Sequence, residues 1–240
     1  MTASEIKDIL AKEYPFRIEL HAHTNPVSGC SEILPEEMAK IYNQKGYDGI
    51  VITNHLFPWD AKDKESYITR HLSGYEETKK AAEGTNLKVY LGAEVRFEEN
   101  SNDYLIYGVD REILESFFDY YKKGIKAFRT EVPLPNSVFV QAHPFRNGMV
   151  RAESQYLDGI ETLNMHPNHN SSVAVATRYA KEQGFKIKTI GSDFHHKNVG
   201  HEAVSALRTR ILPEDSFQLA EILKSGDYCF EIGNDALVLP

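Results

Sequence analysis

The chain has 240 residues, with 27 lysines and arginines against 35 acidic residues, and its formal net charge is −8. This length fits one large α/β domain or two small ones. The acidic balance disfavours an extended nucleic-acid surface, and no apolar run approaches the roughly 18 residues that a membrane span needs. With two cysteines and no apolar core near the N-terminus, we expect a cytoplasmic protein without a disulfide framework. Ten histidines are the compositional feature that remains to be explained.

Short apolar strands alternate with helices along the chain. Proline is favoured at the first position of a helix, so Pro35 is expected to open one. In chain order, we expect helix 4–13, strand 16–20, a helix from Pro35 to about Gly46, strand 49–53, helix 65–83, strands 87–95 and 104–109, helix 111–128, strands 137–142 and 159–163, helix 171–183 and strand 187–190.

The predicted strands are continuous apolar runs, which is typical of a parallel sheet that is buried on both faces. The alternation of strands and helices favours a parallel α/β sheet, and this many strands in 240 residues fit one closed or nearly closed (β/α) barrel better than two domains. We therefore expect residues 1–240 to form a single barrel domain. In this domain, 1–15 would form an N-terminal helix, and 205–240 a C-terminal helix and strand that close the barrel.

Side chains that bind metals recur at the carboxyl ends of the predicted strands. The first strand leads into His21 and His23, and the last leads into Asp193 and His195. Because the carboxyl ends of the strands in a parallel barrel meet on one face, where active sites are built, these residues are expected to share one cleft. The full set of expected metal ligands is His21, His23, His55, Glu94, His143, Asp193 and His195.

The spacing of these residues suits metal coordination. Residues i and i+2 of a strand point the same way, so His21 and His23 can present two imidazoles to one ion, and Asp193 and His195 repeat this arrangement. Imidazole and carboxylate together suit Zn, Mn or Fe, and the two oxygens of Glu94 can bridge two ions. Five histidines and two carboxylates exceed the needs of one ion, so we expect two or three divalent metal ions.

Each of these residues also has an ordinary role when it is taken alone. A lone His-x-His pair can be structural, and a carboxylate such as Glu94 can be a salt-bridge partner. The joint recurrence at separate strand ends favours the metal site. Ordinary roles are expected for other conspicuous side chains: a solvated position for His71, packing instead of stacking on a substrate for Trp59 and Tyr156, loop positions for His166, His169 and His201, and an orientation away from the site for His196.

Six motifs carry a resemblance to a known family. They are residues 19–24 (ELHAHT), 52–55 (ITNH), 92–94 (GAE), 142–146 (AHPFR), 159–164 (GIETLN) and 191–195 (GSDFH). In the order and spacing of these motifs, which run from about residue 17 to 200, the chain resembles the polymerase and histidinol phosphatase (PHP) family of metal-dependent phosphoesterases. The resemblance implies a distorted, TIM-like (β/α)7 barrel with a site for two or three metal ions that cleaves phosphate esters.

The family's metal ligands can be carried over by position. The resemblance implies one ion held by His21, His23, Glu94 and Asp193, a second held by Glu94 and His143, and a third held by His55 and His195. Two family ligands are not matched. After the first motif the candidate is Cys30, either as a soft ligand or as a buried inert thiol, and near the fourth strand the candidate is Asp103.

Together these residues predict metal-assisted hydrolysis of a small phosphate ester. A metal-activated hydroxide would attack phosphorus, Arg146 would stabilise charge on the phosphoryl oxygens, and His195 or His55 would protonate the leaving oxygen. The expected substrate is a phosphomonoester such as histidinol phosphate, or a nucleotide or oligonucleotide end. No membrane partner and no extended nucleic-acid partner is expected.

Three other functions remain open. An amidohydrolase-type barrel hydrolase also begins with His-x-His after its first strand, although Glu94 stands where such an enzyme usually has a bridging lysine. The other two are a non-catalytic metal-binding accessory module and a purely structural barrel. The kind of bond that is hydrolysed, the effect of chelators and the bound metal content distinguish these functions.

Overall fold

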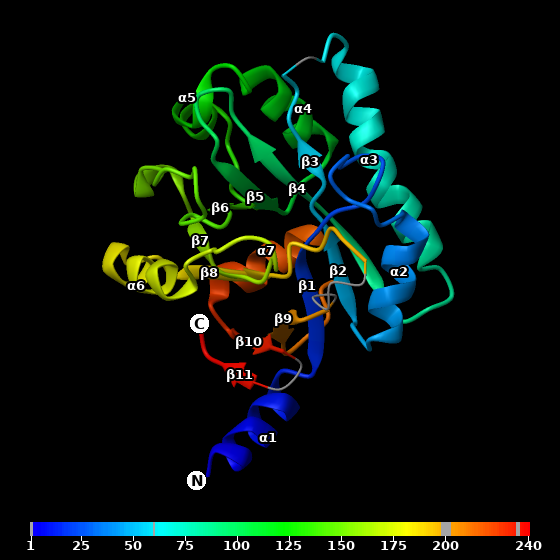
Figure 1. Ribbon diagram of the computed structural model, residues 1–240, viewed down its shortest axis with the longest axis vertical. Helices are drawn as coiled ribbons and strands as arrows, with labels where there is room; N and C mark the ends of the chain where they lie inside the picture. The colour runs from blue at the N-terminus through cyan, green and yellow to red at the C-terminus, as the bar shows by residue number, and fades with distance from the viewer. Residues whose placement is uncertain (1, 60, 198–202, 234–235) are drawn as a thin grey trace.

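The computed structural model describes residues 2–59, 61–197, 203–233 and 236–240 (Figure 1). Its helices are α1 (Ala3–Glu13), α2 (Pro35–Gln44), α3 (Lys64–Ala81), α4 (Arg111–Tyr120), α5 (Gly124–Glu131), the short 3-10 helix η1 (Ser154–Tyr156), α6 (Val173–Gln183) and α7 (Ser216–Ser225). Its strands are β1 (Phe16–Ala22), β2 (Gly49–Ile52), β3 (His55–Leu56), β4 (Lys88–Arg96), β5 (Asp103–Tyr107), β6 (Val138–Gln141), β7 (Gly159–Asn164), β8 (Ile187–Gly191), β9 (Ser205–Thr209), β10 (Tyr228–Ile232) and β11 (Ala236–Val238). None of the helices formed by these residues has the length and apolar character to span a lipid bilayer.

The central strands form a ring. Neighbouring strands pair in the order β1, β2, β4, β5, β6, β7 and β8, and a bridge between Ala22 of β1 and Phe194, just after β8, returns the sheet to its first strand. Beside this bridge, the backbone N–H of His23 donates to the carbonyl oxygen of Phe194 at 3.2 Å. Helices α2 and α3 lie on one side of the strands and α6 on another (Figure 1). The expected distorted α/β barrel is therefore confirmed.

One strand of the ring contradicts the prediction of a fully parallel sheet. β5 pairs antiparallel with both of its neighbours, β4 and β6, whereas the other neighbouring strands of the ring are parallel. The connection from β4 to β5 spans only residues 97–102, and parallel neighbours need a crossover of about a dozen residues or more. Consequently Asp103, the first residue of β5, pairs with Arg96 at the carboxyl end of β4.

Two further segments differ from the expectation. The helix expected over 111–128 is divided into α4 and α5, and Gly124 at the division has a φ of 84°, which favours glycine. The C-terminal part contains β9, α7, β10 and β11 instead of one helix and one strand. β9 pairs antiparallel with β1, and β10 and β11 extend the sheet beyond β9, while the ring itself closes at Phe194.

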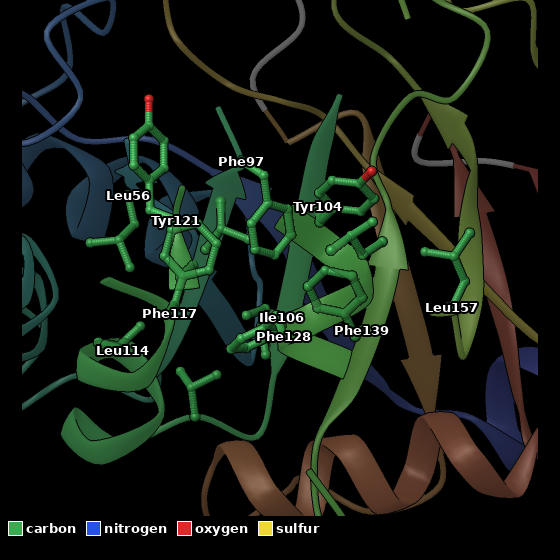
Figure 2. Packing of buried hydrophobic residues seen from close by; sticks show 14 of the residues in the cluster. Leu56, Phe97, Tyr104, Ile106, Leu114, Phe117, Tyr121, Phe128, Phe139 and Leu157 are labelled. Atoms are coloured by element: carbon green, nitrogen blue, oxygen red, sulfur yellow. The ribbon is translucent and has the colours of Figure 1, made fainter. Parts of the chain in front are cut away.

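A large apolar cluster packs strands β4, β5 and β6 against α4 and α5 (Figure 2). The rings of Tyr104 and Phe139 stack with their centroids 5.0 Å apart, and Phe97 packs against Phe117 at 5.0 Å and Phe128 at 5.7 Å. Aromatic pairs of this kind stabilise a core beyond the apolar area that they bury. These strands carry acidic and histidine side chains at or just beyond their ends, so the packing fixes the positions of those groups.

Candidate metal centre

The end of β1 presents two buried histidines to the same pair of carboxylates. Nε2 of His21 lies 3.4 Å from Oε1 of Glu94 and 3.5 Å from Oδ1 of Asp193. Nε2 of His23 lies 3.4 Å from Oε2 of Glu94 and 3.4 Å from Oδ1 of Asp193. Both histidines are fully buried, so these four groups form a compact polar cluster inside the barrel.

Glu94 lies at the centre of this cluster. Its Oε2 is 2.8 Å from Nδ1 of His55, which pairs with it across β3 and β4, and its Oε1 is 3.1 Å from Nε2 of His143. Burial raises the pKa of Glu94, but His21 and His55 outweigh burial and hold this pKa well below its usual range. Burial likewise lowers the pKa of His55, but Glu94 and Cys30 outweigh it and raise the pKa to about 10. A carboxylate kept ionised in the interior needs cationic partners of this kind.

Asp193 faces the same cluster from the segment after β8. Its Oδ1 lies 3.3 Å from Nδ1 of His195. Its Oδ2 accepts hydrogen bonds from Nη2 of Arg146 at 2.5 Å and from Nδ2 of Asn164 at 3.2 Å. Burial raises the pKa of Asp193, but the charge of His21 and the close contact of His23 outweigh it and keep the pKa well below its usual range. The carboxylate is therefore ionised and has one oxygen directed to the histidines.

Asp103 and His143 meet beside Glu94. Nε2 of His143 lies 3.8 Å from Oδ2 of Asp103. Arg96 donates to both oxygens of Asp103, from Nε at 2.7 Å and from Nη2 at 2.9 Å. Burial and the nearby Glu94 carboxylate raise the pKa of Asp103. The reversed direction of β5 thus brings Asp103 to the cluster, and Arg96 compensates its charge.

Cys30 lies beside a third group of side chains, formed by His23, His55 and His195. The ring of His23 is 4.2 Å from that of His195 and 4.4 Å from that of His55. Cys30 is exposed, so the alternative of a buried inert thiol is wrong. Partial burial of the sulfur raises the pKa of the thiol, but hydrogen bonds with His195 and His55 outweigh it and lower the pKa to about 6. Such contacts are typical of a reactive or metal-binding thiol.

The donor atoms of the cluster suit divalent metal ions. The ring atoms Nε2 of His21, Nε2 of His23 and Nδ1 of His55 are buried and have no hydrogen-bond partner among the described residues. Within the same part of the chain, ligand atoms lie within 4.8 Å of one another in three groups: His23, His55 and His195; His21, His23 and Glu94; and Glu94, Asp103 and His143. Because His23 and Glu94 each belong to two groups, the arrangement suits more than one ion. Imidazole nitrogens combined with carboxylate oxygens are donors that Zn, Mn and Fe accept.

Two of these residues have a strained backbone. His143 has a φ of 29° and Asp193 a φ of 53°, and both values lie in the left-handed region that favours glycine. A residue other than glycine in such a conformation costs about 1–3 kcal/mol, and such residues cluster at functional sites. The side chain of His143 contacts Glu94, and that of Asp193 contacts His21. The two strained residues are therefore ones whose side chains enter the cluster.

Glu161 lies directly behind the cluster, although it is not among the ligands that the sequence predicts. Its carboxylate accepts hydrogen bonds from Nδ1 of His21 at 2.9 Å, from the backbone N–H of His143 at 2.9 Å and from Nδ2 of Asn164 at 3.0 Å. A Cβ at Gly191 would lie 2.3 Å from the Cβ of His21 and 2.8 Å from Oε1 of Glu161, so this packing requires glycine. The signal in the sequence was a charged residue inside an apolar strand, which needs a buried polar partner.

Two expectations of ordinary roles are wrong. His71 is buried instead of solvated, and burial lowers its pKa to about 4, although a hydrogen bond with the backbone of His55 opposes the shift. Trp59 is 59% exposed instead of packed, whereas Tyr156 packs against the large apolar cluster as expected. His201 lies outside the described residues.

The remaining histidines lie near His195. The ring of His166 is 5.5 Å from that of His195 and 4.6 Å from that of His169. His166 is buried and His169 is exposed, as residues of a loop beside the cluster. Nδ1 of His196 lies 3.7 Å from Oε1 of Glu32, so this side chain has an acidic partner outside the cluster.

Comparisons with known proteins identify the fold. No protein-family model and no curated protein matches the chain. A two-domain protein of Bacteroides vulgatus, described as containing a candidate PHP-like metal-dependent phosphoesterase, matches with a TM-score of 0.62 and 14% identity over 92% of this chain and 66% of its own. PsfC from Pseudomonas syringae matches with a TM-score of 0.58 and 14% identity, over 86% of this chain and 87% of its own.

A third solved structure, of a Bifidobacterium adolescentis protein described as a candidate metal-dependent phosphoesterase, has a TM-score of 0.50 and 17% identity, over 86% of this chain and 95% of its own. At these identities the matches show a shared fold. The resemblance to PHP-like metal-dependent phosphoesterases that the motifs carry is thus confirmed at the level of the fold.

Proposed function

We propose that this protein is a metal-dependent phosphoesterase that hydrolyses a small phosphate ester, either a phosphomonoester such as histidinol phosphate or a nucleotide or oligonucleotide end. The observation that carries the proposal is the position of Glu94. Its oxygens lie within 3.4 Å of ring nitrogens of His21, His23, His55 and His143. A buried carboxylate among converging imidazoles is the arrangement expected of a site for several metal ions.

The ligand groups can be assigned to two or three ions of Zn, Mn or Fe. His21, His23, Glu94 and Asp193 would hold the first, Glu94 and His143 with Asp103 the second, and His55 and His195 with His23 or Cys30 the third. Ions bound there would supply Lewis-acid polarisation of a phosphoryl oxygen and acidify water at neutral pH.

Arg146 is the side chain that we assign to the phosphoryl oxygens of the substrate. Its Nη2 donates to Asp193 at 2.5 Å and to Asn164 at 2.8 Å, and these bonds hold the guanidinium beside the ligand cluster. Its Nε has no hydrogen-bond partner in the described part of the chain. A guanidinium has five N–H donors in a fixed plane, so it can keep these partners and still donate to a phosphate.

His195 is the side chain that we assign to proton transfer, with His55 as the alternative. Nδ1 of His195 lies 2.8 Å from the backbone carbonyl oxygen of Asp193. The ring N–H donates to this oxygen, so the lone pair lies on Nε2 in the neutral ring. Nε2 is therefore the atom of His195 that can hold a proton for the leaving oxygen when two ions are bound and the third position is empty.

A metal-reconstituted substrate panel tests the proposal. Metal-free protein is loaded separately with Mn²⁺, Zn²⁺ or Fe²⁺ and assayed on histidinol phosphate, sugar phosphates, nucleotides and short oligonucleotides, with amides as the comparison. We expect metal-dependent cleavage of one class of phosphate ester and no cleavage of amides. Cleavage of amides alone would favour an amidohydrolase, and metal binding without any turnover would favour an accessory module, so either result overturns the proposal.

A further inference from the structure

A cavity of about 520 Å³ lies beside the third histidine group. Its walls include Cys30, His55, Phe57, Trp59, Tyr67 and Arg70. This volume falls in the range of small-molecule sites, roughly 300–1,000 Å³. His55 also belongs to the group formed with His23 and His195, so the cavity adjoins the candidate metal centre.

Aromatic rings lead outward from His55 along the wall of this cavity. The ring of Phe57 stacks on the imidazole of His55, with centroids 4.4 Å apart and planes at 29°, and Trp59 follows with its ring 5.5 Å from that of Phe57. Phe57 is buried, and its backbone N–H donates to the Tyr67 hydroxyl at 3.0 Å, which holds this segment in place. Trp59 is 59% exposed, so the series of rings begins at the metal centre and ends at the solvent.

The charge of the cavity differs from that of the whole chain. The chain has a net charge of −8, yet no acidic residue is among the described residues that line this cavity. Arg70 supplies a positive charge, and its Nη2 donates to the carbonyl oxygen of Pro26 at 2.9 Å, which fixes the guanidinium at the wall. The positive charge in the described wall attracts an anionic ester. The aromatic rings of the wall suit a remaining part that is apolar and flat.

We propose that this cavity binds the leaving group of the substrate, and that the leaving group carries an aromatic ring that stacks on Trp59. The inference rests on the proposed function, because a phosphate at the metal centre would direct the rest of the ester past His55 and along Phe57. A planar ring that stacks on an exposed indole gains binding free energy that an aliphatic group of the same size does not gain. The substrate class is therefore a phosphate ester of an aromatic alcohol or of a nucleoside, which share this ring.

Two matched pairs of substrates test the inference on the metal-loaded full chain. Benzyl phosphate and cyclohexylmethyl phosphate have similar size and similarly basic leaving groups but differ in aromaticity, and AMP differs from ribose 5-phosphate by the base. We expect kcat/KM for the aromatic member of at least one pair to exceed that of its partner about tenfold, as is typical for one stacked ring. A preference in the benzyl pair alone identifies an aryl ester, and a preference in the AMP pair alone identifies a nucleotide.

Variants of Trp59 show whether this preference comes from stacking. Trp59→Ala should reduce the preference to about twofold or less, mainly through KM, and Trp59→Phe should restore most of it. Ile211→Ala is the matched control, because Ile211 is similarly exposed at 53% and follows β9, whose end pairs with the start of β1, away from the site. This control should keep the preference. A wild-type preference below about twofold in both pairs, or a preference that survives Trp59→Ala, overturns the inference.

Fluorescence separates this inference from the proposed function. Trp59 is the only tryptophan in the chain, so its emission reports on the cavity without any turnover. AMP or benzylphosphonate should quench the emission at concentrations at which ribose 5-phosphate or cyclohexylmethylphosphonate does not. Quenching without hydrolysis of any ester would refute the proposed function and support the aromatic site. Hydrolysis without quenching and without an aromatic preference would support the proposed function and refute the aromatic site.

Discussion

Nδ1 of His21 lies 2.9 Å from Oε1 of Glu161, and both side chains are fully buried. The ring N–H donates to the carboxylate, so in the neutral ring, which is the form that binds a metal ion, the lone pair of His21 lies on Nε2, the atom that faces Glu94 and Asp193. Metal-binding histidines commonly have their second ring nitrogen oriented by a carboxylate in this way. Glu161 is therefore a positioning residue for the candidate metal centre.

Replacing this carboxylate tests its positioning role. Glu161→Gln should weaken metal affinity about 10- to 100-fold, because the amide is neutral and has only one acceptor oxygen, so it cannot accept from both His21 and the N–H groups of His143 and Asn164. Competition with a metallochromic chelator measures this affinity without any turnover. Glu153→Gln, a change at an exposed glutamate, is the matched control and should bind metal as the wild type does. Equal affinity of Glu161→Gln and the wild type would show that the ion pair is only structural.

The shared position of Glu94 predicts an unequal loss of metal. Glu94 belongs to two of the ligand groups, whereas Asp103 belongs to one and is already paired with Arg96. Glu94→Gln should therefore lose more bound metal per chain than Asp103→Asn. Elemental analysis after equilibrium dialysis against Mn²⁺ or Zn²⁺ measures both losses, and circular dichroism verifies the fold of each variant. The same loss in both variants would argue against a shared ligand.

The contacts of Cys30 with His55 and His195 predict a sulfur ligand at the third group. Thiolate bound to Co²⁺ gives a charge-transfer band in the near ultraviolet. We expect this band in the Co²⁺-loaded wild type and its loss in Cys30→Ser. The matched control is Cys229→Ser, because Cys229 is buried in β10 and its charged neighbours are Arg208, Glu231 and Arg210 instead of His55 and His195. If the wild type lacks the band, or Cys30→Ser keeps it, Cys30 is not a ligand.

The lowered pKa of the buried His71 predicts that the protein loses stability in acid. Burial lowers its pKa from the ordinary 6.5 to about 4 in the folded protein. The unfolded chain takes up a proton at His71 below pH 6.5, whereas the folded protein does so only near pH 4. The contribution to stability is therefore complete above pH 6.5 and is lost as the pH falls toward 4.

His71→Gln removes this titration and keeps a hydrogen-bond donor. Between pH 8 and pH 5, the free energy of unfolding of the metal-free wild type should fall by about 2 kcal/mol more than that of the variant. Urea unfolding at the two pH values measures this difference, and metal-free protein is used so that ligand protonation contributes equally to both. Parallel losses in the two proteins would show that His71 is not the responsible group.

Much of the barrel could be predicted because its signals are local. Apolar runs and helix starts are properties of short segments, and the strand-end positions of His21, His23 and Asp193 follow from them. The direction of β5 could not be predicted in the same way. It depends on whether residues 97–102 turn directly back or lead to a crossover. The polar residues of this segment indicate a turn, but they do not indicate the direction of the strand that follows.

The supporting residues of the site depend on contacts between distant segments. Glu161 contacts His21 across 140 positions of the sequence, and neither segment alone indicates the other. His71 lies on a polar helix, yet the helix turns this residue toward His55 and away from the solvent. Periodicity predicted which side chains converge at the strand ends, but it carries no information on which polar side chain lies behind them.

The most direct test of metal-dependent phosphoester hydrolysis at this cluster is phosphate release under matched metal conditions. The metal-loaded wild type is compared with the same protein after chelation, with His21→Ala and Asp193→Ala, and with Asp119→Ala as an exposed acidic control. We predict turnover only in the metal-loaded wild type and Asp119→Ala, with His21→Ala and Asp193→Ala folded but inactive. Turnover by the chelated protein, or wild-type turnover by Asp193→Ala, would contradict a metal-dependent site at this cluster.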